Sequence, residues 1–246
     1  MDDYEVNTNS LDVMFELTRW CNMECEHCVR GTRQRKRQTQ ENIRLVLNNF
    51  DRISSIMFSG GEPALALDLM EYTLEYCKHH RIRIGNFWMA TNGSVVSKRF
   101  LNCIYDWFEY CDDNDISGLR ISLDPFHEGI SRKSLLKFKG LEQELQYMGY
   151  LGNHGFELST ESYSLVKQGR AESLQTNLTL REPDSDLDSD VALGKLYVTG
   201  TIYVGVNGKY YESCSLSYKT QDELKLMYLG DIKEDLDYLL KQRFED

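Results

Sequence analysis

The residues of this chain most able to carry chemistry are three cysteines in one short segment. Cys21, Cys25 and Cys28 lie within eight consecutive residues, and His27 precedes the last of them. Thiols this close together converge on one metal centre without help from distant parts of the chain. A four-iron cluster takes one terminal ligand for each iron, so three cysteines leave one iron open to a small molecule. The alternative is a structural zinc site in which His27 completes a Cys3His set.

The other four cysteines have an ordinary structural interpretation. Cys77, Cys103 and Cys111 stand among apolar, helix-like residues, and Cys214 ends a strand-like run. Seven is an odd number, and the first residues have neither the basic nor the apolar region of a signal peptide. A disulfide framework is therefore not expected, and the predicted location is the cytoplasm.

A second motif stands about thirty residues further on. Residues 54–59 have the composition of a strand and lead directly into Gly60, Gly61, Glu62 and Pro63. The two glycines let backbone approach a ligand where a β-carbon would clash, and the Glu62 carboxylate is an acceptor for an ammonium group. Taken alone, the same four residues are equally typical of a simple turn.

Together, the two motifs give the chain a family resemblance. The cysteine segment resembles the Cys-x3-Cys-x-aromatic-Cys signature of the radical S-adenosylmethionine (radical SAM) superfamily, with His27 in the aromatic position. Gly60 to Pro63 resemble the Gly-Gly-Glu-Pro motif of the same superfamily. The resemblance implies a [4Fe-4S] cluster on the three cysteines, with S-adenosylmethionine chelating the fourth iron through its amino and carboxylate groups.

Strand-like and helix-like stretches alternate along the first 160 residues. Period-2 and apolar runs predict strands, and 3.6-residue periodicity predicts helices between them. This order predicts an α/β fold with a parallel sheet, and the resemblance implies a partial (βα)6 TIM-like barrel with a C-terminal β-hairpin and helix. The expected strands are 11–18, 54–59, 87–91, 119–123 and 156–159, and the expected helices are 41–50, 65–79, 97–111 and 132–150.

The ends of the next two strands are expected to complete the cofactor site. Thr91 and Asn92 resemble a family segment that closes the third strand near the cofactor, although Asn-Gly is also a common turn pair. Ser122 resembles a serine that binds the ribose or carboxylate of the cofactor, and Asp124 follows it. The segment around His27 is expected on the adenine side, and Glu62 on the amino group. His127 is most simply a loop histidine.

The last third of the chain is expected to form an extension, residues 181–246, on a core domain of residues 1–180. Residues 182–190 are acidic and turn-rich, which predicts a surface loop or a seam between the two parts of the chain. Asn207-Gly208 predicts a type I′ hairpin turn between strands 195–206 and 209–214. This region resembles short SPASM/twitch-type members, but it lacks their auxiliary-cluster cysteines. Only Cys214 is present, a weak candidate for a catalytic thiol.

Charge and composition narrow the partners. The net charge of −11 disfavours broad nucleic-acid binding, and the sequence lacks the phosphate-loop and hydrolase motifs. A local basic run is either a solvated loop or an anion clamp. It comprises Arg30, Arg33, Arg35, Lys36 and Arg37.

The expected function is that of a radical SAM enzyme. The resemblance implies that one electron from the cluster cleaves S-adenosylmethionine to a 5′-deoxyadenosyl radical, which removes a hydrogen atom from substrate. The reductant would be a protein such as flavodoxin or ferredoxin. The C-terminal hairpin favours a peptide or protein substrate, the basic run favours a nucleoside or nucleotide, and a zinc-stabilised binding module is the non-enzymatic alternative.

Overall fold

The fold is organised around one long, mostly parallel sheet. The computed structural model describes residues 5–113, 116–127, 130–151, 156–159, 164–224 and 226–244. Parallel pairing runs from each strand to the next along the chain. These strands are β1 (Glu5–Thr18), β2 (Arg52–Gly60), β3 (Arg83–Thr91), β4 (Gly118–Ser122) and β5 (Phe156–Ser159).

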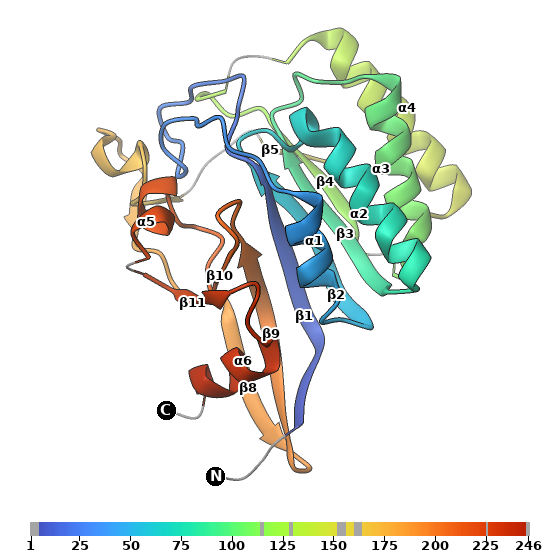
Figure 1. The fold of residues 1–246 in the computed structure, drawn as a ribbon. Helices are drawn as coiled ribbons and strands as arrows, with labels where there is room; N and C mark the ends of the chain where they lie inside the picture. Colours follow the sequence, from blue (N-terminus) through green and yellow to red (C-terminus); the bar gives the residue numbers. More distant parts are fainter. Residues whose placement is uncertain are drawn as a thin grey trace.

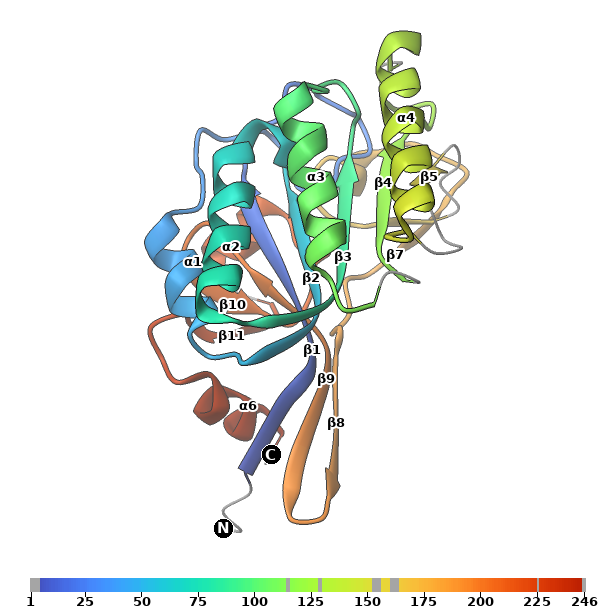
Figure 2. The same ribbon diagram turned by 90° about the vertical axis from the view of Figure 1, so that its right-hand side faces the viewer.

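Helices cover one face of this sheet, as Figure 1 and Figure 2 show. Ser and Thr side chains cap three of them by accepting a backbone N–H of the first turn, which fixes where each helix begins. Pro63–Ala66 form a short 3-10 helix before the second helix. The helices are α1 (Gln40–Leu47), α2 (Leu67–His80), α3 (Lys98–Tyr110) and α4 (Arg132–Met148).

Aromatic packing joins the helical layer to the sheet. Trp107 of α3 is fully buried, and its ring stacks on Phe87 of β3 with centroids 5.5 Å apart and meets Phe58 of β2 edge-on at 5.3 Å. Such pairs add specific geometry to a large apolar burial. The predicted alternation of strands and helices is confirmed, with strand and helix ends shifted by up to six residues.

The C-terminal segment extends the same sheet on the other side of β1. β9 (Lys195–Val204) pairs with β1 in parallel, so that Val13 faces Ile202, and the sheet stays open with the order β11-β10-β9-β1-β2-β3-β4-β5. The incomplete barrel is confirmed. The remaining elements are β8 (Leu187–Ala192), β10 (Lys209–Tyr211), α5 (Tyr218–Glu223), β11 (Tyr228–Asp231) and α6 (Leu236–Phe244).

Two local predictions in this segment were wrong. The acidic stretch 182–190 is only partly a loop, because β8 begins at Leu187 and pairs antiparallel with β9. The turn at Asn207-Gly208 is not type I′, since only Gly208 has a positive φ, of 72°. A type I′ turn needs positive φ at both residues. Asn207 instead donates its side-chain amide to the Tyr211 hydroxyl at 2.7 Å.

A small second sheet lies against the cysteine segment. It pairs β6 (Ser164–Val166) with β7 (Thr179–Arg181), and a short 3-10 helix, Ala171–Ser173, lies between them. Before that helix, the backbone N–H of Arg170 donates to the carbonyl of Cys28 at 3.0 Å. No helix in the described part of the chain is long and apolar enough to cross a membrane.

A buried ionic network ties the C-terminal segment to the end of β1. The Arg19 guanidinium is fully buried and donates to Glu16 at 3.1 Å, to Gln221 at 2.9 Å and to Asp222 at 2.7 Å. Glu16 is also fully buried, and it accepts the Tyr203 hydroxyl at 3.0 Å. These bonds compensate two charges that burial alone would make costly.

We expect Arg19→Ala to reduce the free energy of unfolding by about 3–5 kcal/mol, because it leaves the Glu16 carboxylate buried without its cation. The matched control is Arg44→Ala, which removes an exposed ion pair with Glu41 and should leave the free energy of unfolding nearly unchanged. Urea denaturation of the two variants measures the difference. Equal shifts in both would show that the buried network does not hold the C-terminal segment in place.

Candidate functional site

A cavity of about 370 Å³ opens at the carboxyl ends of the parallel strands. In parallel α/β folds this edge of the sheet is where chemistry is placed. With the exception of Asp124, every residue predicted to bind the cluster or the cofactor lines this cavity. They are Cys21, Cys25, His27, Cys28, Gly60, Gly61, Glu62, Pro63, Thr91, Asn92 and Ser122.

The cysteine loop leaves the end of β1 and returns to it. The N–H of Arg19 donates to the carbonyl of Lys36 at 2.9 Å, and the N–H of Gln34 donates to the carbonyl of Arg19 at 3.0 Å. These bonds close the loop at its base and hold its tip over the cavity. Inside it, the N–H of Cys28 donates to the Cys25 carbonyl at 3.2 Å. The three thiols are therefore held on one short loop that is closed by backbone hydrogen bonds.

The thiols are free, half-buried and suited to a centre larger than one ion. Burial raises the pKa of the Cys21 thiol. The pKa of the Cys25 thiol is raised to about 11, mainly by burial and secondly by the charge of the neighbouring Cys28 thiol. Metal binding would have to displace their protons. Three thiolates leave one iron of a four-iron cluster open to a ligand, whereas a structural zinc site takes four protein ligands.

Glu62 joins the ends of two neighbouring strands through its carboxylate. It is 1% exposed, and its carboxylate accepts the Asn92 N–H at 2.8 Å, the Thr91 hydroxyl at 2.8 Å and the Ala64 N–H at 3.0 Å. Burial raises the pKa of this carboxyl although the three bonds oppose that rise. A carboxylate has about four acceptor positions, so one remains for a ligand in the cavity.

The two glycines before Glu62 allow a close contact with protein backbone. A β-carbon on Gly60 would stand 2.1 Å from the Thr18 carbonyl oxygen, and one on Gly61 would stand 2.2 Å from that of Trp20. The N–H of Gly61 donates to Thr18 at 2.6 Å, and that of Glu62 donates to Trp20 at 3.0 Å. The sequence predicted an approach to a ligand, and the structure adds an approach to the cysteine loop.

The ends of β3 and β4 supply the next side of the cavity. The Asn92 amide donates to Asn22 at 3.0 Å and approaches the Cys21 sulfur at 3.8 Å, so that it links β3 to the cysteine loop. Ser122 ends β4 and is half-buried beside them. The side chains predicted at these strand ends therefore lie together.

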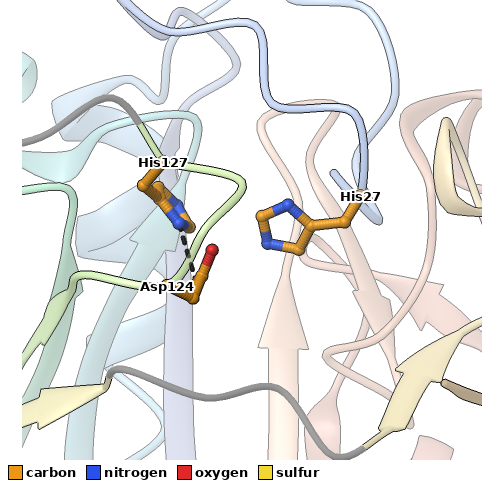
Figure 3. Close-up of side chains that lie close together, drawn as sticks. All are labelled: His27, Asp124 and His127. Carbon is orange, nitrogen blue, oxygen red and sulfur yellow. Dashed lines mark hydrogen bonds and ion pairs between the residues drawn. The ribbon is translucent and has the colours of Figure 1, made fainter. Parts of the chain in front are cut away.

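His27, Asp124 and His127 lie close together, as Figure 3 shows, and the two histidines line the cavity. The His127 Nδ1 atom is 2.8 Å from the Asp124 carboxylate, and the His27 ring lies 5.0 Å from that of His127 and 4.6 Å from that of Phe126. Burial lowers the pKa of His27. Burial acts to raise the pKa of Asp124, but the bond and charge of His127 outweigh it and lower that pKa. His127 is therefore a paired residue, which the sequence did not predict.

The cavity residues that the sequence did not predict include two polar side chains from later parts of the chain. Arg170 precedes the 3-10 helix between β6 and β7, and Tyr218 begins α5; both line the cavity. The Arg170 Nε atom and the Tyr218 hydroxyl are buried without a hydrogen-bond partner among the described residues, as is His27 Nδ1. Buried polar groups of this kind are normally paired, so three of them around one cavity indicate a polar ligand there. Neither segment has a motif that could have revealed them.

Most side chains of the basic run are paired with other groups of the same protein. Arg30 is buried and donates to the Leu216 carbonyl and the Ser59 hydroxyl at 2.8 and 3.2 Å. Arg33, Lys36 and Arg37 form ion pairs with Glu24, Asp222 and Asp68 respectively. Only Arg30 and Arg33 of the five line the cavity.

Cys214 does not line the cavity. Its backbone N–H donates to Asp186 at 2.8 Å, and its side chain packs beside Tyr203, Tyr211 and Leu216. Burial raises the pKa of this thiol. These contacts are those of a structural cysteine.

Comparison with known proteins identifies relatives of this chain. A family model described as Radical SAM superfamily matches residues 15–163. The uncharacterized protein MJ0907 of Methanocaldococcus jannaschii is 26% identical over 123 residues, 48% of this chain and 43% of that protein. The putative protein YfkA of Bacillus subtilis is 31% identical over 177 residues, 69% of this chain and 44% of that protein. The chain thus spans less than half the length of these relatives.

Two solved structures share the fold. Streptococcus suis SuiB bound to the precursor peptide SuiA superposes with a TM-score of 0.54 and 12% identity, covering 95% of this chain and 65% of that one. Native anSMEcpe with bound AdoMet and the Cp18Cys peptide superposes with a TM-score of 0.55 and 14% identity, covering 94% of this chain and 80% of that one. At these identities the likeness establishes the fold.

The backbone contact at Gly61 generates a prediction about stability. We expect Gly61→Ala to lower the free energy of unfolding by about 1–3 kcal/mol, because its β-carbon would collide with the Trp20 carbonyl oxygen. Gly140→Ala is the control, since nothing lies within 4 Å of a β-carbon there, in the middle of α4. It should stabilise the helix by about 0.5–1 kcal/mol. Urea denaturation measures both, and an unchanged midpoint for Gly61→Ala would contradict the contact.

Proposed function

This chain belongs to the radical SAM superfamily, and we propose that it is an enzyme that removes a hydrogen atom from a peptide or protein. When bound, a [4Fe-4S] cluster and S-adenosylmethionine supply the one-electron cleavage that generates a 5′-deoxyadenosyl radical. The observation that carries the proposal is the meeting of three free, half-buried thiols with the Glu62 carboxylate at one cavity.

The three cysteines would hold the cluster, and their loop fixes where it lies. Cys21 accepts the Met23 N–H at 3.4 Å and lies near the Asn92 amide, and both donors favour the thiolate over the thiol. The loop supplies three ligands and leaves an iron for the cofactor.

Strand-end residues would hold the cofactor. The free acceptor position of Glu62 would bind its amino group, and Gly60 and Gly61 would present backbone beside it. Ser122 would bind the ribose or the carboxylate, and the segment around His27 would contact the adenine side. Because Glu62 is held by Thr91 and Asn92, its orientation is fixed before any ligand enters.

A peptide substrate is favoured over a nucleotide by two observations. Both solved structures described above contain a bound peptide. The basic run that suggested a nucleotide has three of its five cations in ion pairs with carboxylates of the same protein. The reaction would also need a one-electron reductant such as flavodoxin or ferredoxin.

Metal analysis tests the cluster. We expect the anaerobically reconstituted protein to be brown and to contain about four irons with sulfide, and Cys25→Ala to lose most of this iron, since one ligand in three is removed. Cys214→Ala is the matched control because this half-buried thiol lies outside the cavity lining. A colourless wild-type protein holding one zinc on its thiols would contradict the proposal and identify a zinc-stabilised module.

Binding of S-adenosylmethionine tests Glu62. We expect Glu62→Gln to weaken binding about 10- to 100-fold, because a charge-assisted hydrogen bond to the ammonium group is lost. Glu212→Gln is the control: Glu212 is also buried, and it is paired with Arg243 away from the cavity. Anaerobic equilibrium dialysis of the cluster-loaded proteins measures both. If Glu62→Gln binds as tightly as the wild type, Glu62 serves only to join β2 to β3.

A further inference from the structure

We propose that His27, Asp124 and His127 form a binding site for one divalent metal ion of the zinc class, separate from the cysteine centre. The three residues come from the cysteine loop and from the turn that follows β4. One ligand atom from each lies within 4.8 Å of the other two, and no other set of three such residues in the described part of the chain does so. The site goes beyond the proposed function, which does not require it.

The side chains are oriented for a shared ligand. In Figure 3 the His27 ring points across a short gap toward the other two, and a dashed line joins His127 to Asp124. The Asp124 side chain is held in place because its other oxygen accepts the Phe126 N–H at 3.0 Å. Phe126 in turn packs on His27. The turn therefore positions Asp124 and His127 before a metal arrives, and its Phe126 ring contacts His27.

The His27 ring offers a nitrogen atom to the gap. In Figure 3 the ring nitrogen farther from the Cβ atom, Nε2, lies on the side of the Asp124 carboxylate and the His127 ring. A cation bound between the three side chains would use this nitrogen and neutralise the Asp124 charge.

The donor set selects the class of ion. Two imidazole nitrogens and one carboxylate oxygen suit zinc and similar divalent transition metals, whereas calcium and magnesium prefer oxygen ligands. Three protein ligands leave a coordination position open. His27 and His127 line the cavity, so that position would face the space where a ligand binds.

Binding requires a small adjustment of one contact. His127 Nδ1 and the Asp124 oxygen are 2.8 Å apart, a hydrogen-bond distance. Ligands about 2.0–2.1 Å from a tetrahedral zinc ion are about 3.3 Å apart, so the pair must widen by about half an ångström if both atoms bind the ion. The ion would then replace the proton that the two atoms share.

Zinc binding to the cluster-loaded protein tests the site. The protein is incubated anaerobically with zinc and desalted, and its iron and zinc contents are measured separately. We expect about one zinc ion for each chain with the iron unchanged. Zinc K-edge absorption should show nitrogen and oxygen ligands at about 2.0–2.1 Å and no sulfur at about 2.3 Å.

Variants provide the control. His127→Ala and Asp124→Asn should each weaken zinc binding at least about 10-fold, whereas His80→Ala should not change it. His80 is an exposed histidine of α2 whose ring stacks on Tyr76. Sulfur ligands to zinc, no zinc retained by the wild type, or equal binding by all variants would overturn the site.

The two proposals fail in different ways. If the protein contains no iron or sulfide but binds zinc through nitrogen and oxygen ligands, the proposed function is refuted and the zinc site stands. If the iron content is about four per chain but no zinc is bound, the zinc site is refuted and the proposed function stands. The absorption spectrum of the wild type decides the ligand set even where a variant fails to fold.

Discussion

The close backbone contact between the end of β2 and the start of the cysteine loop is the constraint on which the site depends. Gly60 and Gly61 lie against Thr18 and Trp20 with no room for a β-carbon, and two backbone hydrogen bonds join the segments. The next residue, Glu62, then holds the end of β3 through its carboxylate. Three strand ends and the thiols are thereby fixed relative to one another, which is what preorganised binding of a cluster and a cofactor requires.

A second constraint acts from the opposite side of β1. Arg19 and Glu16 are both buried, and their partners come from the end of β9 and from α5. The C-terminal segment therefore contributes to the cavity, because Tyr218 of α5 forms part of its lining. The sequence suggests a boundary between this segment and the core. In the structure the two parts share one sheet and are joined by buried ionic hydrogen bonds, so both contribute residues to the cavity.

Local signals account for what the sequence could predict. The spacing of the cysteines, the Gly-Gly-Glu-Pro turn and the strand ends predicted residues that all line the cavity except Asp124, because motifs at the ends of adjacent parallel strands meet at one edge. Contacts between residues that are far apart in the sequence have no such local motif. The parallel pairing of β9 with β1 involves no turn, and Arg170 and Tyr218 stand outside any motif. The strand β8 was not predicted because its first residues belong to the acidic stretch and only one of its side chains, Leu187, is buried.

The position of β9 also affects how the chain is made. β1 is synthesised early and β9 late, so on the ribosome one edge of β1 has no neighbour until most of the chain has emerged. An open edge of this kind is prone to mispairing with other chains.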